Sequence, residues 1–314
     1  MPASLPTPWI VAGALLIEGA IGWPGRLSHP VVWIGRLITM LERRWNRVEW
    51  PDRARRSLGV LTVLILLVVA GGLGWGLQRV AATAPFWPGL MLIAVWGATG
   101  LAARSLFDHV RAVARPLTAG DLPTARLAVG MIVGRDVEAM DEGEVAAAAL
   151  ESLAESFCDG VVAPVFWFVL GGLPGLFVYK AVNTADSMIG HMEPRWRAFG
   201  WAAARTDDVM NWIPARIAGA LIALGGWQGW RIMWRDAGKH ASPNAGWPEA
   251  AMAGALRVRL GGPVRYDGVT TDRPNFGDWE PPRAPDLHRG LRVYGVACAV
   301  LMLLLIAGGF AWPR

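Results

Sequence analysis

The chain has 314 residues, of which 54% are hydrophobic and 18% are charged. Soluble domains carry about 25% charged residues, so this composition indicates a membrane protein rather than a soluble globular one. The net charge of +5 comes from an arginine cluster within residues 36–56, which argues against a nucleic-acid-binding protein. The two cysteines, Cys158 and Cys298, lack metal-ligand or disulfide spacing, which argues against a zinc protein or one stabilised by disulfides.

The first apolar segment, residues 9–23, is predicted to cross the membrane. Neither a basic region nor a small-residue cleavage site precedes it, so we expect it to be retained and not removed as a signal peptide. Glu18 lies inside it, and such a carboxylate is either functional or faces neighbouring helices. His29 and Arg36 follow in SHPVVWIGR, where basic anchoring at the interface is sufficient to explain them.

The arginine-rich stretch 36–56 predicts the orientation of the chain. The positive-inside rule places it in the cytoplasm. Residues 57–78 and 80–103 are then each long and apolar enough to cross the membrane as a hairpin, and residues 293–313 form another span.

Residues 104–159 are predicted to form cytoplasmic helices, because Asp121 can cap a helix start and the alanine-rich run 144–154 favours helix. The apolar segments 160–179 and 209–230 are interrupted, the first by GGLPG and the second by Pro214 with Arg216. We expect both to be broken, re-entrant helices that leave all polar clusters on one face.

These elements predict an all-α polytopic helical membrane protein with about four full spans, broken or re-entrant helices and a cytoplasmic helical insertion. No internal repeat or linker-like tract occurs, so residues 1–314 are predicted to form a single integral membrane domain. Its polar functional stretches are 104–159, 180–216 and 231–290.

Four polar clusters are candidates for chemistry. In ESLAESFCDG, Glu151, Glu155 and Asp159 recur every four residues, and they form either a metal-nucleotide site or a solvated acidic face. The polar residues of YKAVNTADSMIG either bind phosphate and metal, or Lys180 and Asp186 simply pair with each other at the membrane edge. That cluster supplies Lys180, Asn183, Asp186 and Ser187.

The third cluster, ARTDDVMNWIPAR, supplies Asp208, Asn211 and Arg216. Arg216 lies inside an apolar stretch and needs Asp208, a bound anion or another ion-pair partner. The fourth, DAGKHASPNAGWP, is a polar loop that supplies Lys239, Ser242 and Asn244, while its His240 alone is more often an ordinary surface histidine. No P-loop, Rossmann, H-E-x-x-H or C-x-x-C motif occurs, so a nucleotide site here is of a less common kind.

Taken together, six ordered segments resemble the cobalamin-biosynthesis membrane family CobD/CbiB, which makes adenosylcobinamide phosphate. The resemblance covers nearly the whole chain, with one departure at Ser156, where the family usually has asparagine. The segments are HPVVWIGRLI at 29–38, GRDV at 134–137, ESLAESFCDGVVAP at 151–164, YKAVNTADSMIG at 179–190, FGWAAARTDDVMNWIPAR at 199–216 and SPNAGWPEAAMAGAL at 242–256.

The resemblance implies an ATP-dependent amide ligation that joins adenosylcobyric acid to aminopropanol or its phosphate, with Mg2+. A carboxylate acylates an amine poorly, so ATP is needed to activate it before the amine attacks. The implied partners are the corrinoid substrate, aminopropanol (phosphate), membrane lipid and other membrane enzymes of cobalamin assembly, and no nucleic acid. The implied location is the bacterial cytoplasmic membrane with a multi-pass chain, and ATP supply places the active site on the cytoplasmic face.

Side-chain chemistry then suggests roles within that reaction. We expect the catalytic groups to be Glu151, Glu155, Asp159, Lys180 and Asp186, of which Glu151, Asp159 and Asp186 would hold the metal. The expected substrate-binding groups are Asn183, Ser187, Asp208, Asn211, Arg216, Lys239, Ser242 and Asn244. The alternatives are a corrinoid or ion transporter and a noncatalytic membrane sensor of the same superfamily.

Overall fold

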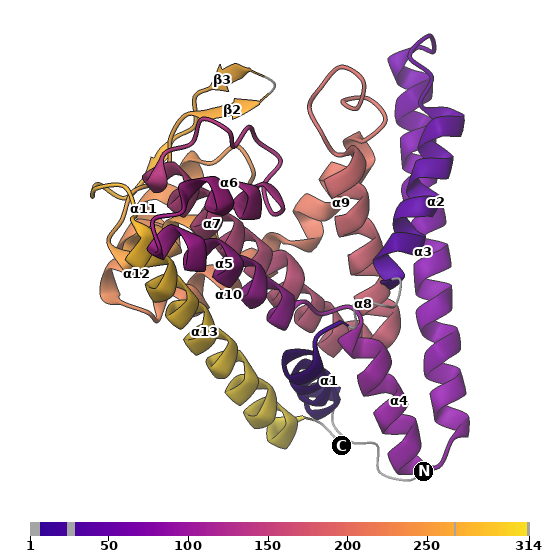
Figure 1. The fold of residues 1–314 in the computed structure, drawn as a ribbon. Coiled ribbons are helices and arrows are strands. Elements are labelled where there is room, and N and C mark those ends of the chain that lie inside the picture. Colours follow the sequence, from indigo (N-terminus) through magenta and orange to yellow (C-terminus); the bar gives the residue numbers. More distant parts are fainter. Residues whose placement is uncertain (1–6, 24–28, 267, 313–314) are drawn as a thin grey trace. The chain divides into compact units, whose positions relative to one another are not determined.

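The structure is a computed structural model that describes residues 7–23, 29–266 and 268–312. It is mostly helical, with two pairs of very short strands (Figure 1). The chain divides into two compact units. The first unit is Met1–Ala102, Ala163–Asn211 and Leu305–Arg314, and the second is Ala103–Val162 and Trp212–Leu304.

Most helices fall wholly within one unit. The first unit contains α1 (Thr7–Ile21), α2 (Pro30–Trp45), α3 (Asp52–Thr83), α4 (Phe86–Ala98), α8 (Ala163–Ile189) and α9 (Trp201–Met210). The second contains α5 (Ala103–Thr118), α6 (Leu122–Gly130), α7 (Glu142–Phe157), the π-helical turn η1 (Cys158–Val162), α10 (Trp212–Ala223), α11 (Trp227–Asp236), the 3-10 turn η2 (Ala237–Lys239), α12 (Gly246–Leu256) and most of α13 (Ala284–Ala311).

Four helical segments of the described chain are long and apolar enough to cross a membrane. They are Asp52–Thr83, Phe86–Thr118, Glu142–Ile189 and Ala284–Ala311. The chain is therefore an all-α polytopic membrane protein, as predicted. The predicted spans 57–78 and 293–313 lie almost entirely within the first and last of these segments.

Two predicted span boundaries differ from the structure. Residues 80–83 still belong to α3, because the chain turns only at Ala84 and Pro85 before α4 begins. The predicted first span, 9–23, is α1, whose 15 residues are about 22 Å long and thus shorter than a bilayer core of about 30 Å. The fourth long segment is instead the run through α7, η1 and α8.

In the first unit, α2, α3, α8 and α9 share one apolar core. Ile38, Val63, Leu66 and Ala185 are buried there, and α2 lies beside α3 (Figure 1). Gly59 permits close packing, because a Cβ on it would lie 1.9 Å from the backbone oxygen of Phe199. Small residues at this contact let the helix and its neighbouring segment touch backbone to backbone.

The predicted break in the segment 160–179 is present. Within α8, Gly172 has φ 61° and ψ −153°, a conformation that favours glycine, and Pro174 follows. The Oε1 of Gln78 on α3 accepts a hydrogen bond of 3.1 Å from the Leu173 N–H beside the kink. A side chain of another helix thus replaces part of the hydrogen bonding that the broken helix loses.

The second unit contains the predicted insertion, and residues 104–159 are helical over most of their length. The Asp121 side chain caps α6 by accepting from the Thr124 N–H, as expected. Asp141 and Glu144 form a capping box at the start of α7, the helix that contains the alanine-rich run.

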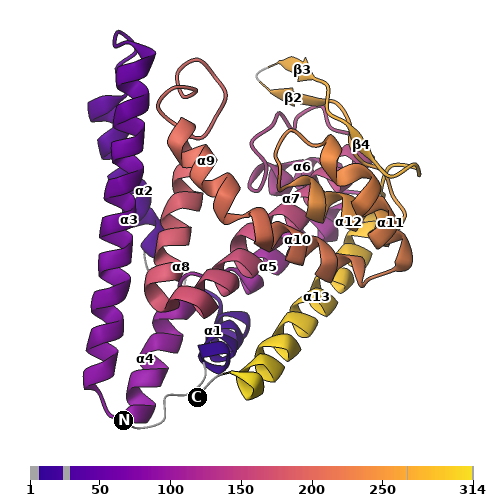
Figure 2. The same cartoon turned by 180° about the vertical axis from the view of Figure 1, so that it is seen from behind.

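The strands of the second unit belong to the segment between α12 and α13. β1 (Leu260–Gly261) pairs antiparallel with β4 (Asn275–Phe276), and β2 (Val264–Tyr266) pairs antiparallel with β3 (Val269–Thr271). Figure 2 shows α10, α11 and α12 grouped together in this unit. The segment 209–230 is interrupted at Asn211 and again at residues 224–226, whereas Pro214 lies in the first turn of α10, where proline is tolerated.

Candidate functional site

A buried ion-pair cluster surrounds Glu151 in the second unit. Arg135 Nη2 donates to Glu151 Oε2 at 2.7 Å, and the Gly261 N–H donates to Oε1 at 2.7 Å. Arg273 Nη1 lies 3.6 Å from Oε2. The Arg135 and Glu151 side chains are only 11% and 6% exposed, so this pair is shielded from water.

Glu249, on α12, faces the same arginine. It is 1% exposed, and its Oε2 lies 3.4 Å from Arg273 Nη2, while His240 Nε2 lies 3.7 Å from its Oε1. Burial raises the pKa of Glu249 well above its usual value, and the negative charges of Glu151 and Glu155 raise it further. The cluster therefore favours the neutral carboxylic acid form of Glu249.

His240 belongs to this cluster and is not an ordinary surface histidine. Its Nδ1 accepts from the Ser242 N–H at 2.9 Å, and its ring stacks on Phe276. Burial lowers the pKa of His240, and the positive charge of Arg273 lowers it further. The neutral imidazole is thus favoured, which suits a proton acceptor or donor near neutral pH.

A cleft of about 510 Å³ opens beside Glu151. Charged residues of both signs line it, namely Arg135, Asp136, Glu138, Glu144, Glu151 and Arg265. Four of these residues are acidic, and the two arginines, Arg135 and Arg265, pair with Glu151 and Asp136 at 2.7 and 3.9 Å. Over the part of the chain that the structure describes, no group of three or more His, Cys, Asp and Glu side chains is placed to hold a metal ion.

The predicted acidic ladder is only partly regular. Glu151 and Glu155 lie on α7, and Glu155 is exposed, but Asp159 lies in the π-helical turn η1. The chain at Asp159 is therefore not the regular α-helix that the four-residue spacing predicted.

Arg216 finds partners other than the predicted Asp208. Its guanidinium lies over the rings of Trp212 and Trp247 at 4.2 and 4.6 Å, and Nη1 lies 3.4 Å from Asn244 Oδ1. Asp208, in the first unit, pairs with Arg205 at 2.9 Å. Cation–π contacts therefore stabilise a half-buried charge for which the sequence suggested an ion pair or a bound anion.

Lys239 and Ser242 have structural contacts in the same loop. Lys239 Nζ lies 2.6 Å from Asp236 Oδ1, and the Ser242 hydroxyl accepts from the N–H groups of Asn244 and Ala245. Burial opposes ionisation of Asp236, but hydrogen bonds from Arg235 and Lys239 outweigh it and lower its pKa to about 2. The loop is therefore held in one shape by its polar side chains.

The first unit contains a separate buried polar network. Tyr179 donates its hydroxyl to Asn211 Oδ1 at 3.0 Å, and Asn211 Nδ2 donates to Asp207 Oδ2 at 2.9 Å. Asn183 Nδ2 donates to Asp207 Oδ1 at 3.3 Å. Asn183 and Asn211 were expected to bind substrate, and here they share the carboxylate of Asp207.

The remaining predicted groups of the first unit lie on α8. Burial lowers the pKa of the His29 imidazole, and the positive charge of Lys180 lowers it further. The Ser187 hydroxyl donates to the Asn183 backbone oxygen, and Gly190 gives Asp186 room, because a Cβ there would meet Asp186 Oδ1 at 1.9 Å. The predicted convergence of this set with the Glu151 cluster on one cavity stays a prediction, as do the individual residue roles.

The chain is similar to proteins that are named for cobalamin biosynthesis. The description "CobD/Cbib protein" belongs to the family that matches residues 11–294. Two relatives, each named "Cobalamin biosynthesis protein CobD", come from Rhodobacter capsulatus and Sinorhizobium sp. They are 48% and 46% identical over 95% of this chain, covering 96% and 97% of their own lengths.

The chain belongs to the CobD/Cbib family. A relative of the same printed name from Halalkalibacterium halodurans is 39% identical over 96% of the chain and 97% of its own length. No solved structure matches. Membership supports a role in cobalamin biosynthesis, and the four long apolar segments agree with a bacterial membrane protein.

Family motifs contain two residues of the Glu151 cluster that the sequence analysis did not select. Arg135 lies in GRDV and Glu249 lies in SPNAGWPEAAMAGAL, so both stood within segments that carry the resemblance. The sequence feature that could have indicated Arg135 and Glu249 is a charged residue inside an apolar or turn-rich motif. Arg273 lies outside all six segments, and only the fold of the β1–β4 segment brings it to Glu151 and Glu249.

Proposed function

We propose that the chain is a membrane-bound ligase that forms the amide bond of adenosylcobinamide or its phosphate. The substrates are adenosylcobyric acid and aminopropanol or aminopropanol phosphate, with ATP as the source of activation. The observation that carries this proposal is the buried Glu151–Arg135–Arg273–Glu249 cluster beside a charged cleft, in a chain of the CobD/Cbib family.

The chemistry of the cluster suits amide ligation. ATP supplies the phosphoryl group that turns the substrate carboxylate into a good acylating agent. Arg135 and Arg265 line the cleft and can bind the phosphates, whereas the attacking amine must lose a proton. Neutral His240 can accept that proton at Nδ1 if this nitrogen gives up the hydrogen bond that it accepts from the Ser242 N–H.

The residues at Glu151 fit a magnesium ion poorly. Its Oε2 is paired with Arg135 and Arg273, and its Oε1 accepts the Gly261 N–H. Both oxygens are thus already used, so we derive no step through a metal at this carboxylate. The predicted Mg2+ role of Glu151 is therefore left out of this proposal, and that of Asp159 and Asp186 stays a prediction.

The remaining expectations complete the proposal. Lys180, Asp186 and the Asn183–Asn211 network belong to the substrate site in it, and the active site faces the cytoplasm, where ATP is available. The proposal also keeps the predicted association with other membrane enzymes of cobalamin assembly. No nucleic acid takes part.

Incubation of the purified full chain with adenosylcobyric acid, ATP and Mg2+ tests the reaction. Parallel samples receive aminopropanol or aminopropanol phosphate, and mass spectrometry detects the amide product. We expect product with at least one amine, and its loss in Glu151→Gln and Lys180→Ala. Glu49→Gln, an exposed acid far along the chain from both clusters, serves as the control and should retain activity.

Two outcomes would count against the ligase. Folded protein that yields no product with either amine would refute the proposed reaction under these conditions. Uptake of labelled adenosylcobyric acid into proteoliposomes without any product would favour the carrier alternative. Full turnover in both Glu151→Gln and Lys180→Ala would remove these residues from the site while leaving the reaction itself standing.

A further inference from the structure

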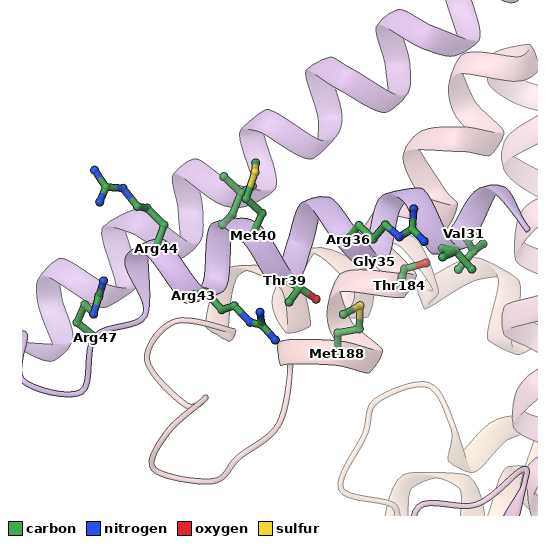
Figure 3. A pocket seen from close by; sticks show the side chains of 12 residues that line it. Val31, Gly35, Arg36, Thr39, Met40, Arg43, Arg44, Arg47, Thr184 and Met188 are labelled. Atoms are coloured by element: carbon green, nitrogen blue, oxygen red, sulfur yellow. The ribbon is translucent and has the colours of Figure 1, made fainter. Parts of the chain in front are cut away.

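A groove in the first unit, which the proposed reaction does not use, carries most of the arginines of the basic stretch. Its volume is about 1120 Å³, and Arg36, Arg43, Arg44 and Arg47 line it. Figure 3 shows these arginines spread along α2 and its C-terminal end, with Thr184 and Met188 of α8 also lining the groove. All four arginines are exposed.

The rest of the groove wall is largely apolar. Val31, Val32 and Met40 of α2 and Met188 of α8 contribute to it. Gly35 lies beside Met188, because a Cβ on it would be 3.4 Å from Met188 Sδ, an ordinary contact distance. The groove thus presents hydrocarbon and positive charge side by side, which is the complement of an anionic amphiphile.

The four arginines have no acidic partner among the described residues, since none of the ion pairs there involves them. Their neighbour Arg55 differs: it is buried and donates to Asn46 Oδ1 at 2.9 Å and to the Arg195 backbone oxygen. Arg55 stabilises the fold, whereas the groove arginines keep their charge available for a ligand.

The groove also lies close to the membrane surface. α3 has 32 residues and is about 48 Å long, whereas a bilayer core needs about 30 Å, so part of this helix extends into the headgroup region. The arginines at its start place that end outside the core. α2 packs on the same end, because Ile38 shares a core with Val63 and Leu66.

Within that region the arginines occupy two depths. Arg43, Arg44 and Arg47 lie at the end of α2 that leads into the start of α3, at headgroup level. Arg36 lies about two helical turns, or about 10 Å, from Arg43 towards the N-terminal end of α2, where a long side chain can still reach the interface. Phosphate would therefore meet the first three arginines, with an acyl chain along Met40 and Met188.

We propose that this groove is a binding site for an anionic phospholipid. Guanidinium groups hold the lipid phosphate, and the apolar wall holds one acyl chain. A zwitterionic lipid would gain the apolar contact but not the full charge complementarity. A soluble phosphate compound would gain the charge contact but not the apolar one.

The test is native mass spectrometry of the full chain in a neutral detergent. Palmitoyl-oleoyl phosphatidylglycerol and the matching phosphatidylcholine are titrated separately. The groove variant is Arg43→Gln/Arg44→Gln/Arg47→Gln. The matched control is Arg53→Gln/Arg111→Gln/Arg292→Gln, which removes the same charge from exposed positions outside the groove. Circular dichroism and size-exclusion chromatography verify that each variant is folded.

We expect phosphatidylglycerol to bind the native chain and the control alike, and phosphatidylcholine to bind both weakly. At about fivefold for each basic residue, the groove variant should lose affinity on the order of 100-fold. A single exposed change, Arg43→Glu, should also weaken phosphatidylglycerol binding. Its small structural cost keeps the proposal testable if the triple variant fails to fold.

Three results would overturn the proposal. Equal phosphatidylglycerol affinity in the groove variant and the control would show that general charge attraction explains binding. Equal binding of the two lipids by the native chain would leave the arginines without a role. Displacement of the bound lipid by inorganic phosphate or ATP at low millimolar concentration would identify the groove as a site for a soluble phosphate compound.

Discussion

Replacing Arg135 by Met tests how strongly the Glu151 cluster depends on burial. The change removes the guanidinium whose Nη2 lies 2.7 Å from Glu151 Oε2 and leaves a buried carboxylate with less compensation. Breaking a buried pair by removing one partner costs about 3–5 kcal/mol. Because Arg273 Nη1 remains 3.6 Å from the same oxygen, we expect a cost near the lower end, about 3 kcal/mol.

The free energy of unfolding can be measured by titration with dodecyl sulfate in mixed micelles, with the fluorescence of the 18 tryptophans as the signal. The control is Arg205→Met. Its pair with Asp208 has a similar distance, 2.9 Å, but the arginine side chain is 64% exposed. An exposed pair contributes about 0–1 kcal/mol, so this variant should unfold almost like the native chain.

A double variant, Arg135→Met/Glu151→Gln, separates the pair from its surroundings. Removing both charges relieves the uncompensated carboxylate, so the double cost should fall below the sum of the single costs by about 1–3 kcal/mol. The reasoning is refuted if Arg135→Met and Arg205→Met have the same small cost. Strict additivity in the double variant would refute it equally.

Three further changes probe other contacts by the same unfolding measurement. Glu249 stays protonated in the native chain at pH values where the unfolded chain has already released this proton. The free energy of unfolding should therefore fall by about 1.4 kcal/mol per pH unit between the usual glutamate pKa and the raised pKa of native Glu249. Glu249→Gln should lack this decline, and parallel pH profiles of the two chains would contradict the raised pKa. Gly59→Ala should cost about 1–3 kcal/mol by forcing backbones apart, whereas Gly72→Ala in the same helix meets open space and should cost nothing; equal effects would contradict the close contact. Tyr179→Phe, which removes a buried hydrogen bond to Asn211, should cost about 1–2 kcal/mol, and an unchanged free energy would show that the bond is not needed.

The sequence was sufficient for the features that depend on local composition. The apolar runs 57–78 and 293–313 are spans because length and lack of charge decide membrane crossing, and the GGLPG break appears because glycine and proline disfavour a regular helix. Asp121 caps α6 for the same local reason. Such features need no knowledge of distant residues.

Features that depend on distant residues could not be read in the same way. Arg273 reaches Glu151 only through the β1–β4 pairing, and Arg216 is stabilised by two tryptophans that no charge pattern indicates. Asp159 lies in a π turn where the spacing predicted α-helix. Tertiary packing in each case selected a partner or a register that local spacing did not specify.

The kink at Gly172 has a consequence for how the protein is made. The Leu173 N–H beside the kink is bonded to Gln78, which lies in a helix synthesised well before α8. When α8 enters the membrane, the acceptor for its broken turn is therefore already present in the nascent chain. A Gln78→Leu chain would deprive that turn of its acceptor, so its defect should appear during insertion, as slower acquisition of protease resistance in a coupled translation and membrane-insertion assay.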